Sequence, residues 1–225
     1  LLVTGNPGSG TVRRLYRNNG NSTFGDVGVN FPVDGATAWG DFDNDGDPDL
    51  LSSGSSGNLI YRNEGNNAFT ALTAGLPNSP TGEAIWGDFN NDGYLDVFMM
   101  GAIGPGYQTR LFLNNNGVAF TDSGLTLPAV GGQIRCADLD NDGDLDFAII
   151  GSPTSDFFLT GVFKVYRNDL ITPNVQPNPP NNLTATITNF GTRLVLSWNA
   201  AADANQTAGL SYNLRLGTQP GASDV

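Results

Sequence analysis

Trp39-Gly40-Asp41-Phe42-Asp43-Asn44-Asp45-Gly46-Asp47-Pro48-Asp49 is the stretch that decides the fold of this 225-residue chain, because it returns twice. The second copy spans residues 86–96 and the third spans 136–146. The first Asp of each acidic loop follows the previous one by 47 and then 50 residues. A period of this length is the signature of a repeat architecture. We call residues 41–49, 88–96 and 138–146 the first, second and third loops.

Each acidic loop is followed by the same series of short apolar segments. After the first loop these are 50–54, 59–63 and 68–70, each rich in aromatic or branched apolar residues and separated by Gly or Asn. This composition is typical of β-strands, and no helical spacing extends over ten residues. Each repeat is predicted to form four antiparallel strands, one entering the loop, one leaving it and two more. Four strands in about 45–50 residues are typical of one β-propeller blade.

The beginning of the chain matches the second half of a repeat. Residues 1–5 correspond to 50–54, and residues 15–18 correspond to 60–63. Residue 1 therefore falls where an acidic loop should just have ended. We expect residues 1–170 to be about three and a half blades of a propeller in a longer polypeptide, with a fourth loop upstream.

Charge is concentrated in the loops. They hold 13 of the 22 acidic residues and no basic residue, whereas the rest of the chain is nearly neutral. A net charge of −12 argues against a nucleic-acid partner. No apolar run approaches the roughly 18 residues of a membrane-spanning segment.

The spacing of oxygen donors in the loops predicts calcium sites. Donors stand at positions 1, 3, 5 and 9, and the glycine at position 6 permits a sharp turn that aims the carbonyl of position 7 inward. Calcium takes six to eight oxygens in a tolerant geometry, so we expect about three Ca²⁺ ions, one per loop. The predicted ligands are Asp41, Asp43, Asp45, Asp47, Asp49, Asp88, Asn90, Asp92, Tyr94, Asp96, Asp138, Asp140, Asp142, Asp144 and Asp146.

Two related sites fit the pattern less well. An EF-hand requires a bidentate Glu at position 12 between two helices, but position 12 is Ser52, Met99 or Ile149 within a predicted strand. Magnesium retains water and favours fewer protein ligands. A solvated acidic turn without metal remains the simpler alternative.

The second loop has three carboxylates instead of five, because Asn90 and Tyr94 replace aspartates, and we expect it to bind calcium most weakly.

With these motifs, residues 1 to about 170 resemble FG-GAP repeats, also called VCBS repeats, which are the blades of integrin-α-type propellers. The resemblance rests on three strand–loop–strand units in register. It implies a propeller with calcium at its rim, where the ion stiffens the hairpin at one end of each blade.

The pattern changes after residue 170. Residues 171–181 contain a proline-rich segment that is expected to act as an extended linker. In residues 182–225 apolar residues alternate with polar ones in three short segments, around Leu183–Ile187, Leu194–Trp198 and Tyr212–Leu216, and this alternation predicts three half-buried strands. These segments resemble the opening strands of a fibronectin type III domain, whose sandwich needs roughly 100 residues.

Residues that could support catalysis are scarce. The chain has no His and one Cys, and the loop carboxylates are assigned to metal. Trp39 and Trp86 could stack on sugars, but Cys136 takes the same place in the third repeat, which favours a core position.

We therefore expect a non-enzymatic adhesion or assembly module of a larger secreted or cell-surface protein, of bacterial type. Its ligand, protein or glycan, is not identified by the sequence, and its other partners are the flanking domains of the same polypeptide. The alternatives are an accessory region of a secreted polysaccharide-degrading enzyme and a structural subunit of an extracellular filament or sheath.

Overall fold

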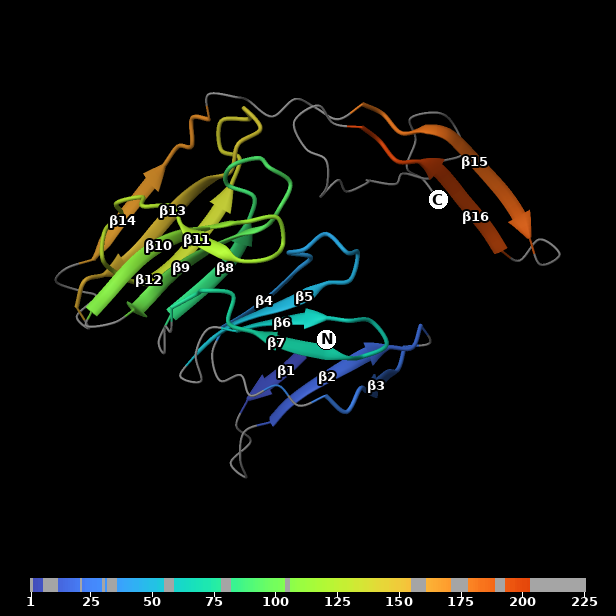
Figure 1. Cartoon of the computed structure of the whole chain (residues 1–225), viewed down its shortest axis with the longest axis horizontal. Helices are drawn as coiled ribbons and strands as arrows, with labels where there is room; N and C mark the ends of the chain where they lie inside the picture. Colours follow the sequence, from blue (N-terminus) through green and yellow to red (C-terminus); the bar gives the residue numbers. More distant parts are fainter. Residues whose placement is uncertain are drawn as a thin grey trace. The chain divides into compact units, whose positions relative to one another are not determined.

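The computed structural model describes residues 2–5, 12–20, 22–29, 31, 36–54, 59–77, 82–103, 106–154, 161–170, 178–188 and 193–202. Every regular secondary-structure element assigned in these residues is a β-strand, which confirms the all-β prediction (Figure 1). No helix in the described residues is long and apolar enough to cross a membrane. The chain forms two compact units, residues 1–174 and 175–225, and their boundary falls within the expected linker.

The described strands of the first unit form four antiparallel sheets (Figure 1). The N-terminal sheet consists of β1 (Leu2–Gly5), β2 (Val12–Asn18) and β3 (Phe24–Asp26). The second sheet consists of β4 (Ala36–Gly40), β5 (Asp49–Ser53), β6 (Leu59–Asn63) and β7 (Phe69–Leu72). The third sheet consists of β8 (Gly82–Gly87), β9 (Asp96–Ile103), β10 (Gly106–Asn114) and β11 (Phe120–Asp122). The fourth sheet consists of β12 (Gly131–Ala137), β13 (Asp146–Ser152) and β14 (Val162–Tyr166).

Strand order within each sheet follows the sequence, so the predicted order of four strands is confirmed in the second and third sheets. Each acidic loop joins the first two strands of its sheet. Gly40 pairs with Asp49, Gly87 with Asp96 and Ala137 with Asp146. The ends of each loop therefore face one another across a hairpin, and the loop is held at a fixed width.

Apolar residues of the central strands are buried on both faces. Along β9, Val97 and Met99 pack toward the second sheet, whereas Phe98 and Met100 pack toward the fourth. This follows from the alternation of side chains along a strand, which makes a continuous apolar run suitable for a sheet packed between two others. The sheets of this unit thus share three apolar clusters, one between each pair of consecutive sheets.

The core prediction holds for two of the three residues that precede the loops. Trp86 and Cys136 are both partly buried. Trp86 packs against the cluster between the second and third sheets, and Cys136 packs against the cluster between the third and fourth sheets. The prediction is wrong for Trp39, whose residue surface is 41% exposed. Trp39 lines a pocket between the N-terminal and second sheets instead.

The second unit contains the antiparallel pair β15 (Asn181–Thr188) and β16 (Arg193–Asn199). Two of the three predicted strands are thereby confirmed, and the segment around 212–216 lies outside the described residues. The expected half-burial is wrong for Leu183, Ile187 and Leu194, which are 69%, 69% and 52% exposed. The described part of this unit is a single pair of strands, and no second layer of it covers these side chains.

Candidate metal centres in the acidic loops

The three loops share one backbone conformation. The glycine at position 6 has a positive φ in every loop, with values of 95°, 88° and 94° for Gly46, Gly93 and Gly143. This confirms the role predicted for these glycines, because L-residues rarely adopt such angles. The Asn at position 4 also has a positive φ of 56–64° in every loop. The sequence signal for this second turn was the repetition of Asn, which tolerates the left-handed region better than most residues.

Carboxylates at positions 1 and 5 hold the backbone turn. Both oxygens of Asp41 accept hydrogen bonds, from the N–H groups of Asp45 and Gly46 at 3.1 and 3.0 Å. Asp45 Oδ1 accepts one from the N–H of Asp47 at 2.9 Å. The second and third loops repeat these contacts through Asp88, Asp92, Asp138 and Asp142. The loop conformation therefore places these carboxylates at its centre.

The Asp at position 9 lies at the base of each loop and has no exposed surface. In the second loop, Asp96 Oδ2 accepts from the N–H of Phe89 at 2.9 Å and Oδ1 accepts from the N–H of Asn114 at 2.8 Å. Asp49 and Asp146 make the same two bonds in their repeats. This carboxylate consequently fastens the start of the loop to the end of the third strand.

In the first and third loops, three carboxylates converge. One oxygen from each of Asp41, Asp43 and Asp49 lies within 4.8 Å of the others. The same holds for one oxygen from each of Asp138, Asp140 and Asp142. Asp43 Oδ1 is buried and has no hydrogen-bond partner among the described residues. A buried oxygen without a donor is costly, and a cation at the centre of the group would satisfy it.

The second loop differs at position 3. Asn90 donates from its amide nitrogen to Asp92 Oδ2 at 2.9 Å. All residues of this loop are described, and no three of its carboxylates converge in the manner of the other loops. The amide of Asn90 thus occupies one oxygen of the Asp92 carboxylate.

The residue at position 7 of each loop was predicted to bind calcium through its backbone carbonyl. The side chains at this position differ in exposure among the three loops. Asp47 is exposed, Tyr94 is half-buried and Asp144 is buried. Asp144 accepts hydrogen bonds from Asn91 Nδ2 at 2.6 Å and from the N–H of Leu170 at 2.9 Å. The carboxylate of Asp144 therefore links two loops, a structural role that the sequence analysis did not assign.

Burial perturbs several loop carboxylates. It raises the pKa of Asp49 to about 6 and that of Asp96 to about 7, despite the two N–H donors of each. Burial is also the main cause of the raised pKa of Asp43 and Asp88. At Asp146, in contrast, the N–H donors of Asn168 and Leu139 outweigh burial and lower the pKa. Burial thus disfavours the deprotonated form of these four raised carboxylates, and a positive charge beside them would favour it.

Asn114, at the end of the third strand of its repeat, and Asn168, just after that strand in the next repeat, connect neighbouring repeats, which the sequence analysis missed. Asn114 Nδ2 donates to the carbonyls of Phe42 and Leu95, both at 2.9 Å. Asn168 Nδ2 donates to the carbonyl of Phe89 at 2.9 Å. The sequence feature that could have indicated these contacts is the recurrence of Asn at the end of this segment in each repeat.

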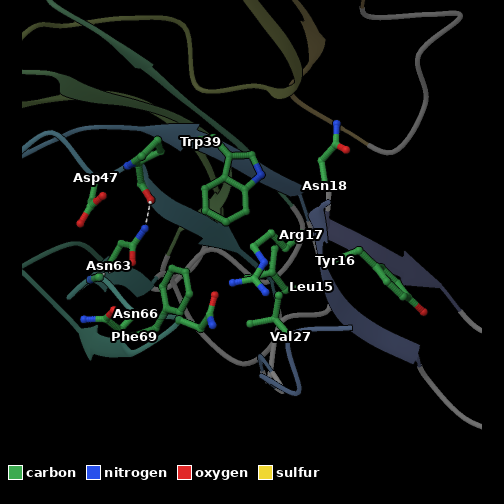
Figure 2. A pocket seen from close by; sticks show the side chains of 13 residues that line it. Leu15, Tyr16, Arg17, Asn18, Val27, Trp39, Asp47, Asn63, Asn66 and Phe69 are labelled. Atoms are coloured by element: carbon green, nitrogen blue, oxygen red, sulfur yellow. Dashed lines mark hydrogen bonds between the residues drawn. The ribbon is translucent and has the colours of Figure 1, made fainter. Parts of the chain in front are cut away.

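A pocket of about 580 Å³ lies beside the first loop. Trp39 and Phe69 of the second sheet line one side, whereas Leu15, Arg17 and Val27 of the N-terminal sheet line the other (Figure 2). The pocket contains both apolar surface and hydrogen-bonding groups.

Comparison with known families agrees with this geometry. Residues 41–99 and 88–149 each match the FG-GAP-like repeat. Residues 41–149 are therefore similar to FG-GAP-like repeats. Each of the two matches begins at the first Asp of a loop and extends into or through the strand that leaves the next loop, so the FG-GAP-like repeat includes the loop that we singled out from the sequence.

Among solved structures, one that describes the specific recognition of non-reducing terminal N-acetylglucosamine by an Agrocybe aegerita lectin is similar to 70% of this chain. The identity is 21% and the TM-score is 0.46. The chain spans about half of that protein, 47% of its length. No curated protein matches the chain significantly.

Proposed function

We propose that the chain is a non-catalytic module of a larger secreted or cell-surface protein, in which each FG-GAP-like loop binds one Ca²⁺ and the sheets act as propeller blades in adhesion or assembly. The observation that carries the proposal is the convergence of Asp41, Asp43 and Asp49, together with the buried Oδ1 of Asp43, which has no hydrogen-bond partner among the described residues. The four-stranded antiparallel sheets, packed face to face, support the blade arrangement.

The chemistry of the donors fits calcium. Each loop offers hard oxygen ligands, and calcium accepts carboxylates together with carbonyls at variable angles. The positive charge of the ion would offset the repulsion among the aspartates and stabilise the folded hairpin, because a ligand that binds only the folded state shifts unfolding. Millimolar extracellular calcium would fill even weak sites of this kind, which supports a secreted or surface setting.

The test is calorimetric titration of the metal-free chain with calcium and, separately, magnesium. We expect about three calcium sites, with magnesium binding more weakly. Asp43→Asn should remove or strongly weaken one site, because it removes the charge of the carboxylate that carries the orphaned oxygen. Asp122→Asn, which removes a carboxylate outside the loops, should leave all sites intact. Equal heats for the chain and Asp43→Asn would contradict the proposal.

For residues 182–225 we propose the opening strands of a fibronectin type III-like domain. The pairing of β15 with β16 and the position of Trp198 on the second strand support it. Side-chain nuclear Overhauser contacts between Trp198 and residues 212–216 in the full chain, without backbone pairing to β16, would place the third segment in the facing sheet of the sandwich, as this domain requires. Their absence would count against it.

A further inference from the structure

The pocket at Trp39 has a filled counterpart in the third sheet. In the third sheet, Trp86 and Phe120 take the places of Trp39 and Phe69, and their ring centroids lie 6.1 Å apart, compared with 6.4 Å for Trp39 and Phe69. The ring of Phe42, from the preceding loop, lies 6.1 Å from both Trp86 and Phe120. Beside Trp39 no described side chain takes the place of Phe42, and Trp39 is exposed as a result.

Hydrogen-bond donors show the same difference. Trp86 Nε1 donates to the carbonyl of Ala38, at 3.2 Å, in the strand that enters the preceding loop. Trp39 makes no such bond among the described residues. The side-chain amide of Asn114 donates both to its own repeat and to the preceding loop, whereas that of Asn63 donates, within the described part of the chain, only to the carbonyl of Pro48 in its own repeat, at 3.1 Å.

The opposite wall of the pocket carries groups that bind an acidic loop elsewhere. Arg167 Nη1 lies 3.3 Å from Asp140 Oδ2, and the N–H of Asn168 donates to Asp146 Oδ1 at 2.8 Å. Arg17 and Asn18 hold the corresponding positions at the end of β2, and both line the pocket. Among the described strands, β1 lies at the edge of its sheet, whereas its counterparts β5, β9 and β13 each pair with the strand that enters the loop.

We propose that this pocket is a binding site for a polypeptide segment that consists of an extended strand followed by an acidic FG-GAP-like loop. The strand pairs with the free edge of β1, and one of its carbonyls accepts the indole N–H of Trp39. The apolar side chain at loop position 2 packs on Trp39 and Phe69, and its carbonyl accepts the second amide hydrogen of Asn63. The loop carboxylates form an ion pair with the Arg17 guanidinium and accept a hydrogen bond from the N–H of Asn18. Adding a strand to an open sheet edge is an established mode of peptide recognition.

The test joins such a segment to the intact chain. A copy of residues 133–146, carrying Cys136→Ser, is placed directly before Leu1, as residues 36–49 precede Leu50. Exchange of the Trp39 indole hydrogen is then followed by NMR, with its peak assigned through Trp39→Phe. We expect at least ~10-fold slower exchange, because an exposed donor becomes hydrogen-bonded and covered. The Trp86 peak serves as an internal reference for correct folding.

A matched extension that carries Leu139→Asp in the added copy should give no protection, because a charged side chain cannot pack on Trp39 and Phe69. Equal exchange in the two extended chains would overturn the proposal. So would a monosaccharide that shifts the Trp39 peak equally in the original and extended chains, because it would show that the pocket serves a different ligand.

Asn66 supplies a second test. It takes the place of Gly117, where an added Cβ would lie only 2.7 Å from the Cα of Asp43 in the preceding loop. The backbone at Asn66 or the bound loop must therefore shift when the segment binds, because the position of a Cβ is fixed by its own backbone. Asn66→Gly should further slow the exchange of the Trp39 indole in the extended chain, and faster exchange in this variant would contradict the proposed geometry.

Discussion

The second and third loops have the same backbone but different surroundings. Phe89, at position 2 of the second loop, is 5% exposed because the fourth sheet packs on it, whereas Leu139 at the same position of the third loop is 60% exposed. The pKa values of the carboxylates at position 9 differ in the same sense. Burial raises the pKa of Asp96 to about 7, whereas the pKa of Asp146 is lowered. The loop is therefore built by its own nine residues, and its electrostatics depend on the next sheet.

The largest expected effect tests this dependence directly. Phe89→Ala should lower the free energy of unfolding by about 3–5 kcal/mol, because it removes a buried ring that contacts Phe98 and Phe147. Leu139→Ala removes an exposed side chain and should change it by less than about 0.5 kcal/mol. Urea unfolding of both variants measures the contrast. Similar losses would mean that Leu139 is covered in solution.

A smaller effect is expected at the asparagines that end the third strands. Asn114→Ala should cost about 2–3 kcal/mol, because it leaves the buried carbonyls of Phe42 and Leu95 without a donor. Asn63→Ala loses only the contact within its own repeat and should cost about 1 kcal/mol. The same unfolding experiment applies. A larger loss for Asn63→Ala would contradict the assigned contacts.

The second loop offers a change that should improve binding. Asn90→Asp adds a carboxylate and removes the amide that donates to Asp92, so calcium should bind this loop roughly tenfold more tightly. Calorimetric titration measures the effect against the unchanged chain. In the unchanged chain the second loop is expected to fill last, and its filling first would refute the ranking.

The smallest expected effect concerns position 4. Asn91→Gly keeps the positive φ but loses the bond to Asp144, and should cost about 1 kcal/mol. Asn141→Gly changes an exposed residue of the third loop with the same φ and should be nearly neutral. Thermal unfolding in the presence of chelator compares the two. Equal shifts would show that the contact with Asp144 adds nothing to stability.

These pairs also show what the sequence could predict. The order of strands and the turn at Gly46 were predictable, because both depend on residues adjacent in the chain. The contact of Asn114 with Phe42 was not, since it joins residues 72 apart and requires knowledge of which sheet faces which. The exposure of Trp39 was missed for the same reason. Its local pattern equals that of Trp86, and only the missing neighbour distinguishes the two.

The side-chain amides at position 4 have a consequence for binding order. Asn44 donates to the carbonyl of Gly93 in the second loop at 2.9 Å, and Asn91 in turn donates to Asp144 in the third. The three loops thus form a row in which each one restrains the next. Any ligand that orders one loop lowers the entropic cost of ordering its neighbour, and this coupling acts equally in both directions. Filling of one loop would therefore raise the affinity of the loop beside it.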